Sequence, residues 1–404
     1  MGDRRMVDLL KYVDEEGAVR LCQELVRIPS PIGEEKKLAE FLAEYMKRIG
    51  LQDVELVEGE ADRPNVVGKI GGSGRGRSLN FYGHIDSEYV GERSFWSVDP
   101  YGGEIRENRL YGRASKDMKA GIASFLKAAE AIVRSGVKLQ GDLQLTFCVD
   151  EETAGDKGLG YMIEKGYVKT DASVQSETYS FGDIMVADAG FLWLELTAEG
   201  ASVHCQLDSE RKKGVNAVEK MAKVILALSE LSLDFEEHPL FKGMRPAVTP
   251  GTTIASRVGE HPNVVPEICT ATVDVRLLPG QKGDEVIESV KKLISELQLR
   301  DRDIKIKIRE IGRREPNEIP LDDPIIDVCA RNFERITGKK ARVVGHEMTS
   351  DNFWLRKAGI SAIHFGPGNL TAHKPDEYID VEEIKQATKI YTLVATEYIG
   401  VEGH

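Results

Sequence analysis

The middle of the chain carries the pattern that most restricts its fold. Between about Asp188 and Gly312, strand-like runs such as GFLWLELTAEG and EICTATVDVRLL alternate with two helical runs, NAVEKMAKVILALSEL and GDEVIESVKKLISELQ. The elements follow one another as strand, helix, strand, strand, helix, strand, which is the order of the ferredoxin-like, split βαβ arrangement. Residues 188–312 are therefore predicted to form a compact domain of their own.

The sequence on both sides of this segment alternates strands and helices. Strand-like runs lead into GHIDS and into VDEE, and a helix with one apolar face is predicted from Asp117 to Arg134, with Gly136 as its C-cap. This alternation predicts an α/β domain with a mixed, mostly parallel sheet flanked by helices. Because 404 residues are too many for one core, we expect residues 1–187 and 313–404 to form one domain, into which 188–312 are inserted.

Charge and cysteine usage exclude several kinds of partner and location. Lys and Arg number 54 against 67 Asp and Glu, and the net charge of -13 argues against nucleic acids and anionic membranes as partners, since both attract basic surfaces. No apolar run approaches the ~18 residues of a membrane span, and the first residues lack the apolar core of a signal peptide. Five scattered cysteines without a CxxC pair indicate a reduced, cytoplasmic protein.

Three acids stand side by side where one apolar run ends. The run from Leu143 to Val149 is followed by Asp150, Glu151 and Glu152. Like charges at this spacing repel one another unless positive charge compensates them. A solvated loop explains such a cluster, and so does a site in which one acid binds a metal ion while its neighbour handles a proton.

Other potential metal ligands also follow predicted strands or lie in loops. Ligands collect at the carboxyl ends of parallel strands, and imidazoles with carboxylates make a plausible ligand set for two zinc ions. Each residue alone has a structural alternative, because a single histidine is more often structural and Asp117 could cap a helix. The candidates are His84, Asp86, Asp117, Glu177 and His373.

A series of motifs decides between these alternatives. They include LVRIPSPIGEE, GHIDS, LYGRASKDMKAG, VDEET, ASVHCQ, NVVPE, TSDNFWLRKAGI and HFGPGNLTAHKPDEYIDVEEI. With these motifs in this order, nearly the whole chain resembles the M20 family of co-catalytic metallopeptidases and amidohydrolases. The resemblance implies hydrolysis of a linear amide or peptide bond with two divalent metal ions, most simply Zn²⁺, with Co²⁺ or Mn²⁺ as alternatives.

The resemblance also implies how the ligands are shared between the two metals. Asp117 would bridge them. His84 and Glu177 would complete the protein ligands of one metal, and Glu152 and His373 would complete those of the other.

Two further acids receive roles from the resemblance. Asp86 would orient His84, and Glu151 would be the general base that deprotonates the bridging water and later protonates the leaving amine. Glu152 then binds metal while its neighbour moves the proton, and the metal charge offsets their repulsion. Asp150 is expected to be peripheral.

The inserted domain resembles the family's lid and dimerisation domain, so a homodimer through this domain is expected. His204 would help to stabilise the tetrahedral oxyanion, in its own site or in the partner's. Asn263 and Arg276 would hold polar or carboxylate groups of the substrate, although a surface ion pair is the alternative for Arg276. Gly366 and Gly368 would form a backbone turn beside the substrate.

Some positions depart from the family pattern. The family usually has Gly in place of Ala114, often Gly in place of Ala120, and commonly Pro in place of Thr178. These changes remove neither a ligand nor the base, but they leave the subfamily open. Four histidines receive no role: His238, His261, His346 and His364.

The favoured function is zinc-dependent hydrolysis of an amide bond in a small N-acyl amino acid, of the deacylase or desuccinylase type. A dipeptidase or carboxypeptidase of the same family shares every catalytic residue and differs only in its substrate pocket. A catalytically inactive binding relative should lack a ligand or the base, and this sequence lacks none of them.

Overall fold

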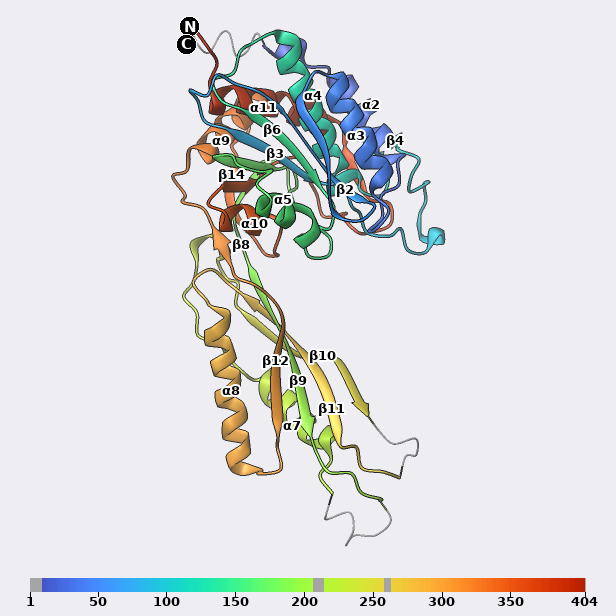
Figure 1. Cartoon of the computed structure of the whole chain (residues 1–404), viewed down its shortest axis with the longest axis vertical. Helices are drawn as coiled ribbons and strands as arrows, with labels where there is room; N and C mark the ends of the chain where they lie inside the picture. Colours follow the sequence, from blue (N-terminus) through green and yellow to red (C-terminus); the bar gives the residue numbers. More distant parts are fainter. Residues whose placement is uncertain (1–8, 206–213, 258–262, 404) are drawn as a thin grey trace. The chain divides into compact units, whose positions relative to one another are not determined.

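The chain divides into two compact units (Figure 1). The computed structural model describes residues 9–205, 214–257 and 263–403. The first unit contains residues 1–186, 319–344 and 350–404, and the second contains residues 187–318 and 345–349. The candidate metal ligands all belong to the first unit.

A mixed nine-stranded sheet contains the main strands of the first unit. Its strand order is β1-β2-β6-β3-β7-β15-β8-β13, with β14 paired to β8. The central strands β6, β3, β7 and β15 are parallel neighbours, whereas β1, β2 and β8 pair in antiparallel fashion. The predicted α/β fold with a mixed sheet is confirmed. The strands are β1 (Gln52–Glu60), β2 (Arg63–Ile70), β3 (Leu79–His84), β6 (Leu143–Cys148), β7 (Ala172–Gln175), β8 (Asp183–Asp188), β13 (Asn317–Glu318), β14 (Arg342–His346) and β15 (Ser361–His364).

Helices cover both faces of this sheet. Successive side chains of a strand point to opposite faces, so neighbouring residues of β3 contact different helices. On β3, the ring of Phe81 stacks on Phe125 of α4 at 4.4 Å and lies 5.5 Å from Tyr391 of α11. The next residue, Tyr82, belongs to a buried cluster on the other face that includes Met162 of α5 and Leu355 of α10. The helices are α2 (Glu15–Val26), α3 (Lys36–Arg48), α4 (Ala120–Ser135), α5 (Tyr161–Glu164), α9 (Pro324–Thr337), α10 (Asn352–Lys357) and α11 (Val381–Ile399).

The segment before α4 is not the regular helix that the sequence predicts. The predicted C-cap is confirmed, since Gly136 has φ 70. At the other end, regular helix begins only at Ala120, after a tight turn, η3 (Ser115–Lys119). Within this turn Asp117 has φ -123 and ψ 83, which is not helical. The predicted start at Asp117 is therefore wrong, because the backbone N–H of Asp117 donates to the carboxylate of Glu377.

A small antiparallel sheet links two distant loops of the first unit. It has the order β16-β5-β4, and Tyr378 of β16 pairs with Tyr111 of β5. This pairing joins the segment that leads to Asp117 with the segment that follows His373. The strands are β4 (Glu104–Arg106), β5 (Arg109–Tyr111) and β16 (Tyr378–Asp380).

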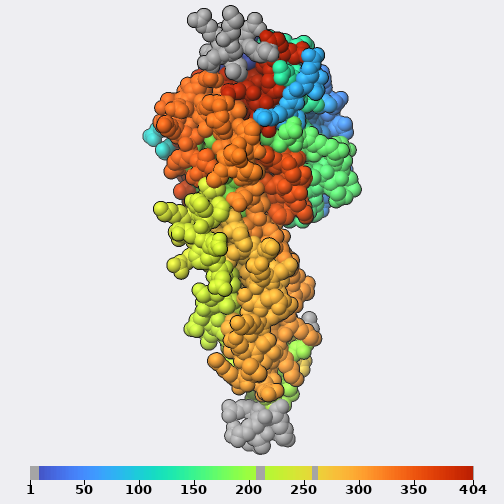
Figure 2. All heavy atoms as spheres, turned by 90° about the vertical axis from the view of Figure 1, so that its left-hand side faces the viewer, coloured from blue at the N-terminus to red at the C-terminus, as the bar shows by residue number. Residues whose placement is uncertain are grey.

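The second unit has the predicted order of elements. Its four strands form an antiparallel sheet in the order β10-β11-β9-β12. Alternate residues of β9 and β11 meet α7 and α8 in one core, and the opposite side of α8 is exposed to solvent (Figure 2). The elements are β9 (Gly190–Glu199), α7 (Ala217–Ser229), β10 (Ala247–Arg257), β11 (Ile268–Leu277), α8 (Gly283–Arg300) and β12 (Ile306–Arg314).

Two further features concern the expected location of the chain. All five cysteines are free thiols, and only Cys205 is exposed. Among the described helices, none combines the length and the apolar character that a membrane crossing requires.

Candidate metal centre

The candidate ligands lie at one edge of the large sheet. His84 ends β3, Glu152 follows β6, and Glu177 follows β7. Because these three strands are parallel neighbours, their carboxyl ends share an edge. Asp117 and His373 come to this edge on loops, η3 and the loop between β15 and β16.

Asp117 lies between the two imidazoles. Its Oδ1 is 3.0 Å from Nε2 of His84, and its Oδ2 is 3.3 Å from Nε2 of His373. Nε2 of His373 is also 3.0 Å from Oε1 of Glu152, and Nε2 of His84 is 3.9 Å from Oε2 of Glu177. The fold thus brings all five candidates together, and each oxygen of the Asp117 carboxylate faces a different histidine.

The charges of this group fit bound cations. Burial, together with the nearby Asp117 carboxylate, raises the pKa of Glu152 to about 7. Hydrogen bonds to Asp117 and Glu152 raise the pKa of His373 to about 11. Burial lowers the pKa of His84, but its carboxylate neighbours outweigh this effect and raise the pKa well above its usual value. The cluster therefore holds protons on its imidazoles, and divalent cations would supply the same positive charge.

Glu151 shares this crowded environment. Burial raises the pKa of its carboxyl well above the ordinary range. The negative charges of Asp351, Glu177 and Glu152 act in the same direction, while His84 opposes them. A buried carboxyl whose pKa is shifted by charged neighbours is a candidate for proton transfer.

Asp86 connects His84 to the loop of acids. The ring Nδ1 of His84 lies 3.1 Å from the backbone oxygen of Asp86 and 3.6 Å from its Oδ1. This contact on Nδ1 leaves Nε2 facing Asp117. The carboxylate of Asp86 in turn accepts from the backbone N–H groups of Glu151, at 3.3 Å, and Glu152, at 3.0 Å.

Asp150 has a structural task that the sequence does not reveal. It adopts φ 76, and its carboxylate accepts from the hydroxyl of Thr153 at 2.5 Å and from the N–H of Lys157 at 3.1 Å. Arg63 lies 3.5 Å from Asp150 and also pairs with the buried Glu35. These contacts turn the loop so that the two glutamates that follow reach the sheet edge. In the sequence Asp150 is visible only as a third acid beside Glu151 and Glu152, because its partners Thr153, Lys157 and Arg63 are identified only by the fold.

The predicted glycine turn is required by close packing. A Cβ atom on Gly366 would lie 2.2 Å from the hydroxyl of Tyr391, and one on Gly368 would lie 2.0 Å from the backbone oxygen of Thr178. Thr178, at a position where the family commonly has Pro, donates its hydroxyl to the backbone oxygen of Gly366 at 2.8 Å. The role of this turn in substrate binding stays a prediction.

The predicted lid residues all lie in the second unit. Nδ2 of Asn263 is 2.9 Å from Nε2 of His204, so these two residues contact each other. Arg276 instead pairs with Asp274 on its own strand, at 2.9 Å, which is the alternative considered for it. Their roles toward a substrate stay predictions.

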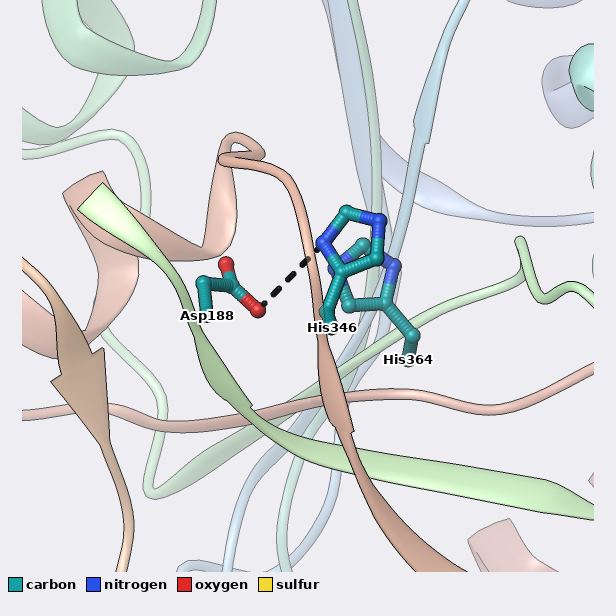
Figure 3. A group of neighbouring side chains, drawn as sticks. All are labelled: Asp188, His346 and His364. Atoms are coloured by element: carbon teal, nitrogen blue, oxygen red, sulfur yellow. Dashed lines mark ion pairs between the residues drawn. The ribbon is translucent and has the colours of Figure 1, made fainter. Parts of the chain in front are cut away.

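The remaining histidines have local partners where they are described. His238 pairs with Glu318 at 3.0 Å. Within the second unit, Nδ1 of His346 lies 3.6 Å from Oδ1 of Asp188, as the dashed line in Figure 3 shows. Nε2 of His364, also drawn there, lies 2.9 Å from the hydroxyl of Ser350. His261 lies outside the described residues.

The carboxyl of Glu383, beside the glycine turn of Gly366 and Gly368, makes the free energy of unfolding depend on pH. Burial raises the pKa of Glu383, on α11, from 4.5 to about 7, although the N–H of Gly368 donates to it. The folded chain therefore binds this proton more tightly than the unfolded chain does. Its contribution to stability is present below pH 4.5 and is lost as the pH rises toward 7.

We expect Glu383→Gln to remove this loss. The variant should be more stable than the wild type above pH 7 by on the order of 1–3 kcal/mol, and about equal to it at pH 4. Urea unfolding at several pH values measures the difference, with Glu382→Gln on the exposed neighbour as the control. A difference that does not change with pH would contradict the assignment.

Comparisons with known proteins bear on family and fold. The model of Peptidase family M20/M25/M40 matches residues 80–397. The chain is 25% identical to the N-formyl-4-amino-5-aminomethyl-2-methylpyrimidine deformylase of Bacillus subtilis, over 96% of each protein. It is 28% identical to the succinyl-diaminopimelate desuccinylase of Cereibacter sphaeroides, over 94% of this chain and 98% of that enzyme.

A solved structure is similar along the whole chain. The crystal structure of a tripeptidase from Staphylococcus aureus superposes with a TM-score of 0.78 and 18% sequence identity, covering 96% of this chain and 99% of that one. At this identity the likeness concerns the fold alone. It agrees with the α/β architecture described above.

Proposed function

Because this chain belongs to peptidase family M20/M25/M40 and is a metallohydrolase, we propose that it removes the acyl group from a small N-acyl amino acid. Two divalent ions, most simply Zn²⁺, would bind the five ligands described above. The observation that carries the proposal is the position of Asp117, whose two oxygens lie 3.0 and 3.3 Å from the imidazoles of His84 and His373. A carboxylate placed in this way suits a ligand shared by two metals.

The residues of the chain divide the remaining work. Bound metal ions would polarise the amide carbonyl and lower the pKa of a water molecule. Glu151 takes the proton from that water and passes it to the leaving nitrogen. Asp86 holds His84 in orientation and, through its carboxylate, holds the backbone of Glu151.

The acyl substrate is favoured over a peptide by the sequence relatives. They are named a deformylase and a desuccinylase, whereas the tripeptidase is similar in fold alone. A dipeptidase or carboxypeptidase activity is the second candidate, because it needs the same metal-binding residues. A binding protein without catalysis is disfavoured, since Glu151 lies in the same charged environment as Glu177 and Glu152.

A substrate screen tests this choice. Protein loaded with Zn²⁺, Co²⁺ or Mn²⁺ is offered N-formyl, N-acetyl and N-succinyl amino acids alongside dipeptides and tripeptides. We expect the highest kcat/KM on an N-acyl amino acid. Preferential cleavage of peptides would favour the second candidate, and no hydrolysis of any linear amide would contradict the proposal.

The second unit is proposed to act as a lid and to form a homodimer, with His204 stabilising the oxyanion of the tetrahedral intermediate. Loss of one such donor lowers kcat by about 10²–10³. His204→Ala should therefore lose turnover while both metals stay bound. His238→Ala, another histidine of the same unit that pairs with Glu318, is the control and should keep its activity.

Mixing two inactive variants tests whether His204 acts across the dimer. Random exchange between His204→Ala and Glu151→Gln subunits makes hybrids with one complete site, which should restore about a quarter of the wild-type activity. No recovery after confirmed exchange would place the donor within the same chain. A monomer in light-scattering measurements would refute the dimer.

A further inference from the structure

Glu377 is a buried acid to which neither the sequence nor the proposed chemistry gives a role. It has no solvent exposure, and each of its carboxylate oxygens accepts two hydrogen bonds. Oε1 accepts from the backbone N–H groups of Lys116 at 3.0 Å and Asp117 at 3.2 Å. Oε2 accepts from Nη1 of Arg113 at 2.8 Å and from the N–H of Ala114 at 3.2 Å. The carboxylate therefore holds the backbone of the turn that carries Asp117.

Arg113 extends this connection to two more loops. Its Nη2 donates to the backbone oxygen of His373 at 3.4 Å and to that of Tyr89 at 3.2 Å. His373 is itself a candidate ligand, and Tyr89 belongs to the loop that leaves His84. Arg113 is only 2% exposed, and its guanidinium lies over the ring of Trp96 at 5.1 Å.

The turn needs these acceptors because it is not helical. Even in a regular helix, the N–H groups of the first turn have no acceptor within the helix. The backbone of Asp117 is not helical, so the N–H groups of this turn need acceptors from elsewhere. Buried N–H groups without partners are costly. Without Glu377 the turn has to rearrange, and the carboxylate of Asp117 moves with it.

We propose that Arg113 and Glu377 are a positioning pair that sets the distance between Asp117 and His373 and thereby the affinity for metal. The inference rests on the proposed metal centre but not on the identity of the substrate. It concerns residues that orient the ligands, and neither Arg113 nor Glu377 is expected to touch the metal or the substrate. Loss of contacts that orient metal ligands typically costs 10–100-fold in metal affinity.

Glu377→Gln is the decisive variant, because it preserves shape and removes acceptors. In either orientation of the amide, its NH₂ group faces two N–H donors instead of accepting from them. Glu397→Gln is the matched control. This acid on α11 pairs with Arg331 and Asn332 of α9, at 2.6 and 2.8 Å, and none of the contacts described for it reaches a candidate ligand.

Zinc affinity, measured by competition with a chelator, and the visible spectrum of the Co²⁺-loaded protein are the two readouts. We expect Glu377→Gln to bind at least one metal 10–100-fold more weakly and to change the Co²⁺ spectrum. Glu397→Gln should leave the zinc affinity and the Co²⁺ spectrum unchanged. A thermal melt of the metal-free variants separates a loss of affinity from a loss of fold.

Arg113→Lys keeps the test decisive if Glu377→Gln does not fold. The lysine retains the positive charge beside Glu377 but cannot also reach the backbone oxygens of Tyr89 and His373. It should weaken metal binding as well. Wild-type metal affinity and an unchanged Co²⁺ spectrum in the folded variants would overturn the inference. A wild-type chain that binds no metal would instead refute the proposed function, and the inference with it.

Discussion

We expect Glu151→Gln to keep two metal ions per chain and to lose nearly all of its turnover. The amide has the shape of the acid but cannot take a proton from water, and removing a general base typically costs about 10²–10⁴ in rate. The loss should lie at the upper end, because the same group returns the proton to the leaving nitrogen. The measurement combines kcat on the best substrate with metal content by elemental analysis.

The local arrangement explains why metal content should survive this change. Glu151 is held through its backbone, whose N–H donates to Asp86 at 3.3 Å, and this contact does not depend on its side chain. Asp156→Asn, on an exposed residue that follows in the same loop, is the control and should behave as the wild type. If Glu151→Gln retains a kcat near that of the wild type, the base has been assigned to the wrong residue.

Asp117→Ala should lose both metal ions. Its two oxygens lie 3.0 Å from His84 and 3.3 Å from His373, so the change removes a ligand from each proposed site. Two protein ligands then remain per metal, fewer than the three that catalytic zinc sites keep. Elemental analysis after gel filtration should find less than one metal per chain, with circular dichroism confirming the fold.

Variants of the other ligands provide a graded comparison. Glu177→Ala and His373→Ala each remove a ligand from one proposed site and should retain about one metal per chain. Two metals retained by Asp117→Ala would show that this carboxylate does not bridge. Together with Glu151→Gln, the series separates residues that hold metal from the one that moves the proton.

The local pattern of apolar residues in the sequence was sufficient to predict most of the fold. The alternation of apolar residues along β9 and β11 and the apolar stripes of α7 and α8 lead to the observed second unit. Gly136 ends α4 because only the left-handed region, φ 70, suits that position. Strand β8, Asp183–Asp188, is not predicted from the sequence. Like β3 and β6, it is buried along its whole length, and a short buried run gives no clear periodicity.

Three of the candidate ligands, His84, Glu152 and Glu177, could be found in the sequence because they end or follow apolar strand runs. Polar residues directly after apolar runs mark strand ends, and the resemblance to a family then assigned them roles. The residues that hold the ligands carry no such signal. Arg113 and Glu377 are 264 positions apart, and Asp150 read as a peripheral charge although it organises its loop.

The sequence alone predicted most of the elements and their order, because these depend on periodicity and residue type over a few neighbouring positions, and the resemblance to a family named the candidate ligands. Only the tertiary structure decided that helix α4 begins at Ala120 and not at Asp117. The reason is that a buried N–H group must find an acceptor. For Lys116 and Asp117 that acceptor is the carboxylate of Glu377, which only folding brings beside them.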